Sequence, residues 1–155
     1  MAFYQFYNEQ LISASVDELW NFITSPENLK KITPDYMGFD ICSKDLPEKI
    51  YEGMIISYIV KPMFGLKTNW VTEITHVRDR EYFVDEQRIG PYSLWHHQHI
   101  IEQQGDKVLM KDIVSYRPPF SFLGRIANKF IIQAKLNEIF EYRSQIIESI
   151  FKSKV

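Results

Sequence analysis

The chain alternates apolar and polar residues along most of its length, and the period of the alternation lengthens near the C-terminus. The first block, residues 2–12, alternates with a period of two and is rich in aromatic residues, which is typical of a β-strand. From about Phe39 to Tyr116 the pattern indicates about six more strands. Short turns separate them, so neighbouring strands are expected to be antiparallel. The clearest strand-length runs are residues 54–62, 67–77, 81–89, 92–103 and 107–117.

Helical signals occur in two other places. Ser15 and Glu18 have the spacing of a capping box at the start of a short helix, and a second short helix begins with Ser25 as its cap and Pro26 in its first position. The second helix should end at Thr33-Pro34, because the residue before a proline disfavours helical geometry. A long helix is predicted from about residue 121 to residue 151, where apolar residues recur at steps of three and four: Ile132, Leu136, Ile139, Phe140, Ile147 and Ile150.

This order of elements predicts an α+β fold in which the helices lie on one face of an antiparallel sheet. The length of 155 residues predicts a single domain spanning residues 1–155. The net charge of −2 and the lack of a basic stripe argue against a nucleic-acid partner. A single cysteine, Cys42, excludes an internal disulfide. Without a signal-peptide pattern or an apolar run of about 20 residues, we expect a cytoplasmic protein with no membrane span.

The strand at residues 107–117 carries a carboxylate on its apolar face. Lys107 and Lys111 mark one face as solvated, so Asp112 points inward between Met110 and Val114. If Gln104 and Gly105 form the turn to the preceding strand, His97 lies directly opposite Asp112. The inner face of that preceding strand then holds Trp95, His97, His99 and Ile101, whereas His96 and Gln98 point outward.

A buried carboxylate requires a partner, and two residues are candidates. His97 is the first. The second is Arg143, which lies on the apolar stripe of the long helix, so its charge must meet a carboxylate across a cavity, a bound ligand, or solvent at the rim.

The three histidines within residues 96–99 allow three interpretations. A metal site would need His97, His99 and a third ligand, for which Asp112 or His76 could serve. An acid–base pair would use His97 as a base that Asp112 orients. A polar seam in a cavity wall is the interpretation we prefer, and it predicts neither a metal nor any other cofactor.

Three segments together resemble the START-like or SRPBCC superfamily: "LWNFITSPENLKKITP", residues 85–124 beginning "DEQRIGPYSLWHHQH", and "LNEIFEYR". The resemblance covers the whole chain. It is most specific for the bacterial ligand-binding SRPBCC proteins, some of which are fused to epimerase-like domains. The residues that carry it are Gly90, Pro91, Tyr92, Trp95, His97, His99, Asp112, Tyr116, Pro118 or Pro119, and Gly124.

The resemblance implies a helix-grip fold, in which a curved seven-stranded antiparallel sheet surrounds the long C-terminal helix and leaves a cavity between them. The chain lacks the glycine-rich loop of the plant allergens in this superfamily, and no catalytic set of the cyclase branch matches it. We therefore expect a non-enzymatic protein that binds a small hydrophobic or amphipathic molecule. Its expected ligand-binding residues are Trp70, Phe83, Trp95, His97, His99, Asp112, Tyr116 and Arg143.

Two alternatives remain open. The first is a cyclase or dehydratase of the polyketide type, with His97 as base and Asp112 orienting it. The second is an accessory domain that acts with a protein partner.

Overall fold

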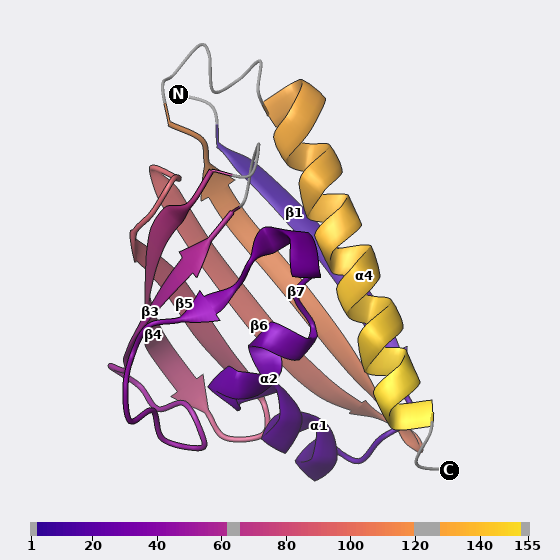
Figure 1. Cartoon of the computed structure of the whole chain (residues 1–155). Coiled ribbons are helices and arrows are strands. Elements are labelled where there is room, and N and C mark those ends of the chain that lie inside the picture. Colours follow the sequence, from indigo (N-terminus) through magenta and orange to yellow (C-terminus); the bar gives the residue numbers. More distant parts are fainter. Residues whose placement is uncertain (1–2, 62–65, 120–127, 153–155) are drawn as a thin grey trace.

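A computed structural model describes residues 3–61, 66–119 and 128–152 of the chain (Figure 1). The turn expected at residues 62–65, Gly124 and the first turns of the expected long helix, residues 121–127, lie outside the described residues.

A seven-stranded sheet forms the body of the protein, in the order β1-β7-β6-β5-β4-β3-β2, with every neighbouring pair antiparallel. The chain leaves β1 at one edge, crosses to β2 at the other edge, and returns strand by strand until β7 pairs with β1. The predicted α+β architecture is confirmed. The strands are β1 (Tyr4–Ile12), β2 (Asp40–Ile41), β3 (Ile55–Val60), β4 (Thr68–Arg78), β5 (Tyr82–Ile89), β6 (Leu94–Gln104) and β7 (Lys107–Arg117).

Two short helices make the crossover from β1, and they pack together at one end of the sheet (Figure 1). In α1 (Val16–Ile23) the predicted capping box is present, because the Ser15 side chain accepts from the Glu18 amide and the Glu18 carboxylate accepts from the Ser15 amide. In α2 (Pro26–Lys31) Ser25 is the N-cap residue, but its side chain makes no capping hydrogen bond. A 3₁₀ turn, η1 (Asp35–Met37), leads from α2 towards β2.

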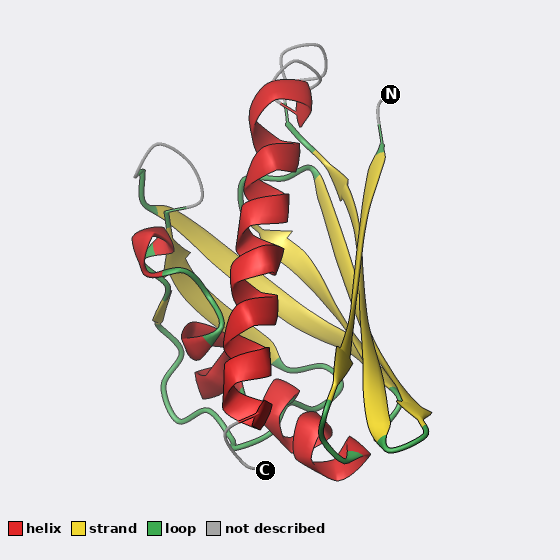
Figure 2. Ribbon diagram, turned by 90° about the vertical axis from the view of Figure 1, so that its right-hand side faces the viewer, coloured by secondary structure: helices red, strands yellow, loops and turns green. Residues whose placement is uncertain are grey.

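The long helix α4 (Gln133–Lys152), preceded by the π-helical turn η2 (Asn128–Ile132), lies across the concave face of the curved sheet (Figure 2). Its buried stripe consists of Leu136, Phe140, Arg143, Ile147 and Phe151, and the Phe140 ring lies 4.7 Å from that of Phe6 in β1. None of the described helices combines the length and the apolar character that crossing a membrane requires.

The pairing of β6 with β7 differs from the predicted one by two residues. The turn consists of Gly105 and Asp106 rather than Gln104 and Gly105, so His99, not His97, lies directly opposite Asp112. Gly105 has φ +61°, which suits the first position of a two-residue hairpin turn. Because side chains alternate with a period of two, a shift by two leaves every residue on its predicted face. Asp112, His97 and His99 accordingly remain together on the inner face.

Candidate functional site

A cavity of about 180 Å³ lies between the concave face of the sheet and α4. Residues from α1, α2 and η1 also line it, so the crossover from β1 closes part of the cavity wall. Most of the lining is apolar, including Ile56, Ile74, Leu136, Ile139 and Phe140.

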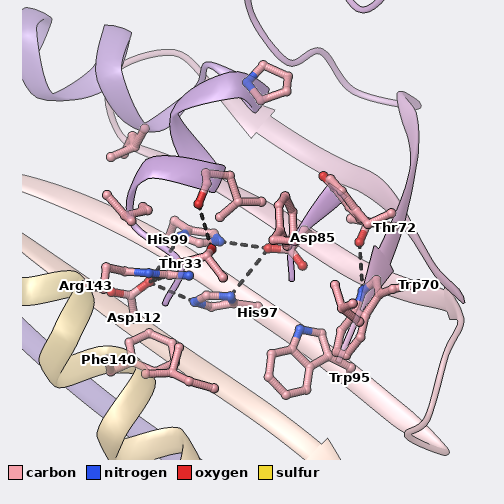
Figure 3. A pocket seen from close by; sticks show the side chains of 18 of the residues that line it. Thr33, Trp70, Thr72, Asp85, Trp95, His97, His99, Asp112, Phe140 and Arg143 are labelled. Atoms are coloured by element: carbon pink, nitrogen blue, oxygen red, sulfur yellow. Dashed lines mark hydrogen bonds and ion pairs between the residues drawn. The ribbon is translucent and has the colours of Figure 1, made fainter. Parts of the chain in front are cut away.

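Three aromatic side chains form one part of the cavity wall. The rings of Trp70 and Trp95 meet edge to face at 5.2 Å, and Tyr92 lies 5.8 Å from Trp70 and 5.0 Å from Trp95. The Trp70 indole N–H donates to the Thr72 hydroxyl at 3.1 Å, which fixes the ring (Figure 3). This aromatic corner offers flat apolar surface next to the polar part of the wall.

The polar part of the wall is the Asp–His cluster, which we define as Asp85, His97, His99, Asp112 and Arg143 (Figure 3). His97 Nε2 and His99 Nδ1 lie 2.8 Å and 3.1 Å from Asp112 Oδ1. The other nitrogens, His97 Nδ1 and His99 Nε2, lie 3.5 Å and 2.8 Å from Asp85 Oδ2. Each imidazole therefore bridges the same two carboxylates.

The two carboxylates and two imidazoles of the cluster lie on three adjacent strands, β5, β6 and β7. His97 and His99 are two residues apart on β6, so both point inward, and their rings lie 3.7 Å apart. Alternate residues along a strand are roughly 7 Å apart, so the two side chains turn towards each other. On β5, Asp85 pairs with His97, and Phe83 pairs with His99 and stacks on its ring at 4.1 Å.

Arg143 approaches the cluster from α4. Its Nη1 lies 3.8 Å from Asp112 Oδ1, and its guanidinium group lies over the Phe140 ring at 4.8 Å. Of the three partners open to this buried arginine, the structure provides the carboxylate across the cavity.

The two carboxylates are held ionised. Burial alone would raise the pKa of Asp112, but hydrogen bonds from His97 and His99 outweigh burial and hold the pKa far below its ordinary value of 3.8. Burial also opposes ionisation of Asp85, but favourable interactions led by the hydrogen bond from His99 outweigh burial and lower the pKa of that group as well.

The pKa values of the two histidines shift in opposite directions. Burial lowers the pKa of His97, and the neighbouring His99 lowers it further. For His99, hydrogen bonds to Asp112 and Asp85 outweigh burial and raise the pKa. A protonated His99 and Arg143 then balance the two carboxylates, and a neutral His97 donates its Nε2–H to Asp112.

Two buried atoms of the cluster have no hydrogen-bond partner among the described residues. They are Asp112 Oδ2, an acceptor, and Arg143 Nε, a donor. Buried polar atoms are usually paired with protein or water, so these two mark a place for a further polar group.

Seven of the eight side chains expected to bind a ligand line the cavity, and Tyr116 does not. Its ring is buried behind the wall, 6.0 Å from Tyr92 and 6.4 Å from Trp95. His96 bonds Glu86 on the outer face at 2.8 Å, and His76, considered as a metal ligand, is exposed beside Thr75. The seven lining residues are Trp70, Phe83, Trp95, His97, His99, Asp112 and Arg143.

Sequence reasoning missed Asp85, which completes the cluster. The signal was present, because the alternation that directs Phe83 inward on β5 directs Asp85 inward too. Asp85 Oδ2 and one nitrogen of each of His97 and His99 lie within 4.8 Å of one another, which makes this group a possible metal-binding set.

Solved structures similar to this chain share its fold at low sequence identity. The protein TTHA0849 from Thermus thermophilus is 14% identical with a TM-score of 0.73, and the match covers 97% of this chain and 98% of that one. A START superfamily protein from Mycobacterium smegmatis is 11% identical with a TM-score of 0.70, covering 97% and 99%. Ginseng major latex-like protein 151 from Panax ginseng is 12% identical with a TM-score of 0.69, covering 96% and 97%.

No protein-family model matches the chain, and no curated protein matches its sequence. The structural matches nevertheless extend over nearly the whole length of both chains in each pair. The chain has the START-like, or SRPBCC, helix-grip fold: an open seven-stranded antiparallel sheet with a long C-terminal helix across its concave face.

Proposed function

We propose that this protein binds a small, largely apolar molecule in the cavity between the sheet and α4, with an oxygen-bearing polar end at the Asp–His cluster. The observation that carries the proposal is the composition of the cavity wall, which is mostly apolar and aromatic and holds the carboxylates and imidazoles of the cluster at one place. Pockets for small molecules have this character, with a few placed polar groups that fix orientation.

The unpartnered atoms of the cluster support the nature of the polar end. Arg143 Nε requires an acceptor and Asp112 Oδ2 requires a donor. A ketone oxygen satisfies the first atom, and a hydroxyl group satisfies either. The aromatic corner of Trp70, Tyr92 and Trp95 would pack against the apolar body of the same molecule.

The neutral naphthyl ketone dye prodan has both features and reports its surroundings by fluorescence. We expect it to bind metal-free protein with blue-shifted emission. An Ile56→Phe variant, which fills space in the cavity, should lose this binding. The matched control is Ile55→Phe, because Ile55 is the preceding residue but points outward and is 50% exposed. Equal binding by the two variants would contradict the proposal.

Acid–base catalysis is a second candidate function, which the His97–Asp112 pair favours. His97 has a lowered pKa and donates Nε2–H to Asp112, so a neutral, oriented imidazole is available as a base. Asp85 Oδ2 lies 3.5 Å from its Nδ1, so a substrate must enter beside that carboxylate. If the protein catalyses cyclisation or dehydration of a ketone, His97→Gln abolishes turnover and spares ligand binding. If the protein only binds its ligand, the wild type and His97→Gln both show no turnover and bind the ligand equally.

That the protein acts together with a protein partner stays a prediction from the sequence.

A further inference from the structure

We propose that Asp85, His97 and His99 form a binding site for one first-row transition-metal dication, with Asp112 as the hydrogen-bond partner that orients both histidines. This site does not rest on the proposed ligand function, because metal binding can be tested with the metal alone. Two imidazoles and one carboxylate form the ligand set that such ions prefer over the all-oxygen set of calcium or magnesium.

The separations between the carboxylate oxygen of Asp85 and the two imidazole nitrogens match those of ligands that share one metal ion. Asp85 Oδ2 lies 2.8 Å from His99 Nε2 and 3.5 Å from His97 Nδ1. Ligand atoms that share a metal at bond lengths of about 2.1 Å lie about 3–3.5 Å apart. Two of the three separations therefore fit a shared ion, and all three ligand atoms lie within 4.8 Å of one another. The three side chains also line the cavity, from which an ion can enter.

Asp112 provides the second, independent observation. It is fully buried, and its Oδ1 faces the nitrogen of each histidine that points away from Asp85. Metal-binding histidines almost always donate their other ring N–H to an oxygen in this way, which fixes the tautomer. A single carboxylate here accepts from His97 Nε2 and His99 Nδ1, so His97 Nδ1 and His99 Nε2, which both face Asp85, are the nitrogens that would bind the ion.

The charges around the cluster are compatible with an ion. Arg143 Nη1 lies 3.8 Å from Asp112 Oδ1, and so it supports the orienting carboxylate. With neutral imidazoles, a bound dication, the two carboxylates and Arg143 together give the cluster one net positive charge. Three protein ligands leave a coordination position open, so the metal would attract an oxygen of a molecule in the cavity.

The first test is titration of chelator-treated protein with Zn²⁺ or Co²⁺ by calorimetry and visible absorption. We expect one equivalent per chain in the wild type and in the matched control His96→Gln, because His96 precedes His97 on β6 and points to the opposite face, where it contacts Glu86. Asp85→Asn should bind more than about 100-fold more weakly, since loss of even a hydrogen-bond partner of a metal-bound histidine costs about 10–100-fold. Wild-type protein that binds no metal, or equal affinity in Asp85→Asn and His96→Gln, overturns the site.

A second measurement keeps the test valid if a variant fails to fold. Nitrogen-15 NMR of the wild-type histidine rings on Zn²⁺ addition should show coordination through Nδ1 of His97 and Nε2 of His99, so the two histidines use opposite nitrogens. Shifts at His76 or His96 instead, or the same nitrogen in both cluster histidines, contradict the site. Because neither measurement involves an organic ligand, failure of this site and failure of prodan binding are separate results.

Discussion

Asp112 lies directly opposite His99 in the β6–β7 ladder, and its Oδ1 is 3.1 Å from His99 Nδ1. The same oxygen accepts a 2.8 Å hydrogen bond from His97, two residues earlier on β6, and lies 3.8 Å from Arg143. One fully buried carboxylate thus connects the sheet to the long helix. It also sets the charge of the polar wall of the cavity.

Removing this carboxylate is expected to destabilise the fold. Asp112→Ala leaves a protonated His99 and Arg143 buried without their shared partner, and loss of one member of a buried ion pair costs about 3–5 kcal/mol. Urea denaturation of metal-free protein measures the change. Asp106→Ala, an exposed aspartate in the β6–β7 turn, is the control and should change the free energy of unfolding by less than about 0.5 kcal/mol. Equal effects of the two substitutions would show that Asp112 does not hold the cluster.

His97 and His99 should each contribute to the stability of the fold, and the two contributions should depend on pH in opposite ways. The pKa of His99 is raised above its ordinary 6.5, so its stabilising contribution is fully present below pH 6.5 and is lost as pH rises through the folded-state pKa. The pKa of His97 is lowered, so the unfolded chain binds the proton first and stability falls as pH drops below 6.5.

Single variants separate these contributions when unfolding of chelator-treated protein is followed between about pH 5 and about pH 8. The difference in unfolding free energy between wild type and His99→Gln should shrink as pH rises. The difference for His97→Gln should grow over the same range. Parallel curves for the two variants would mean that the two imidazoles share one protonation state.

How much of this site follows from sequence depends on what each pattern determines. The period of two placed Asp112, His97 and His99 on one face correctly, because the lysines on the opposite face of β7 left only one orientation. Which of the two histidines lies directly opposite Asp112 depends on the residues that form the turn. Their composition excludes neither Gln104-Gly105 nor Gly105-Asp106.

Other parts of the site depend on contacts between distant segments. Arg143 was placed on the apolar stripe of its helix, yet its carboxylate partner is 31 positions away in the chain by their residue numbers and required the packing of α4 on the sheet. Tyr116 shares the inner face of β7 with Asp112 but is covered by Tyr92 and Trp95, so strand alternation alone could not separate a cavity wall from the layer behind it.

Arg143 should contribute to ligand binding through its unpartnered Nε. Arg143→Met keeps the apolar stem and removes the donor, so we expect prodan affinity to fall by about fivefold, which corresponds to the roughly 1 kcal/mol of one hydrogen bond. Lys135→Met is the control, because Lys135 also lines the cavity but pairs with Glu138 on the surface of α4. A loss confined to Lys135→Met would instead place the polar end of the ligand at the rim.

Native mass spectrometry of freshly purified wild-type, Ile55→Phe and Ile56→Phe proteins, followed by extraction of whatever is bound, tests ligand binding in the cavity most directly. We expect a small-molecule adduct on the wild type and on Ile55→Phe, and its loss from Ile56→Phe, whose added ring occupies the cavity. An adduct of equal occupancy on both variants would contradict binding in this cavity. So would a wild-type chain that carries no adduct and also fails to bind prodan.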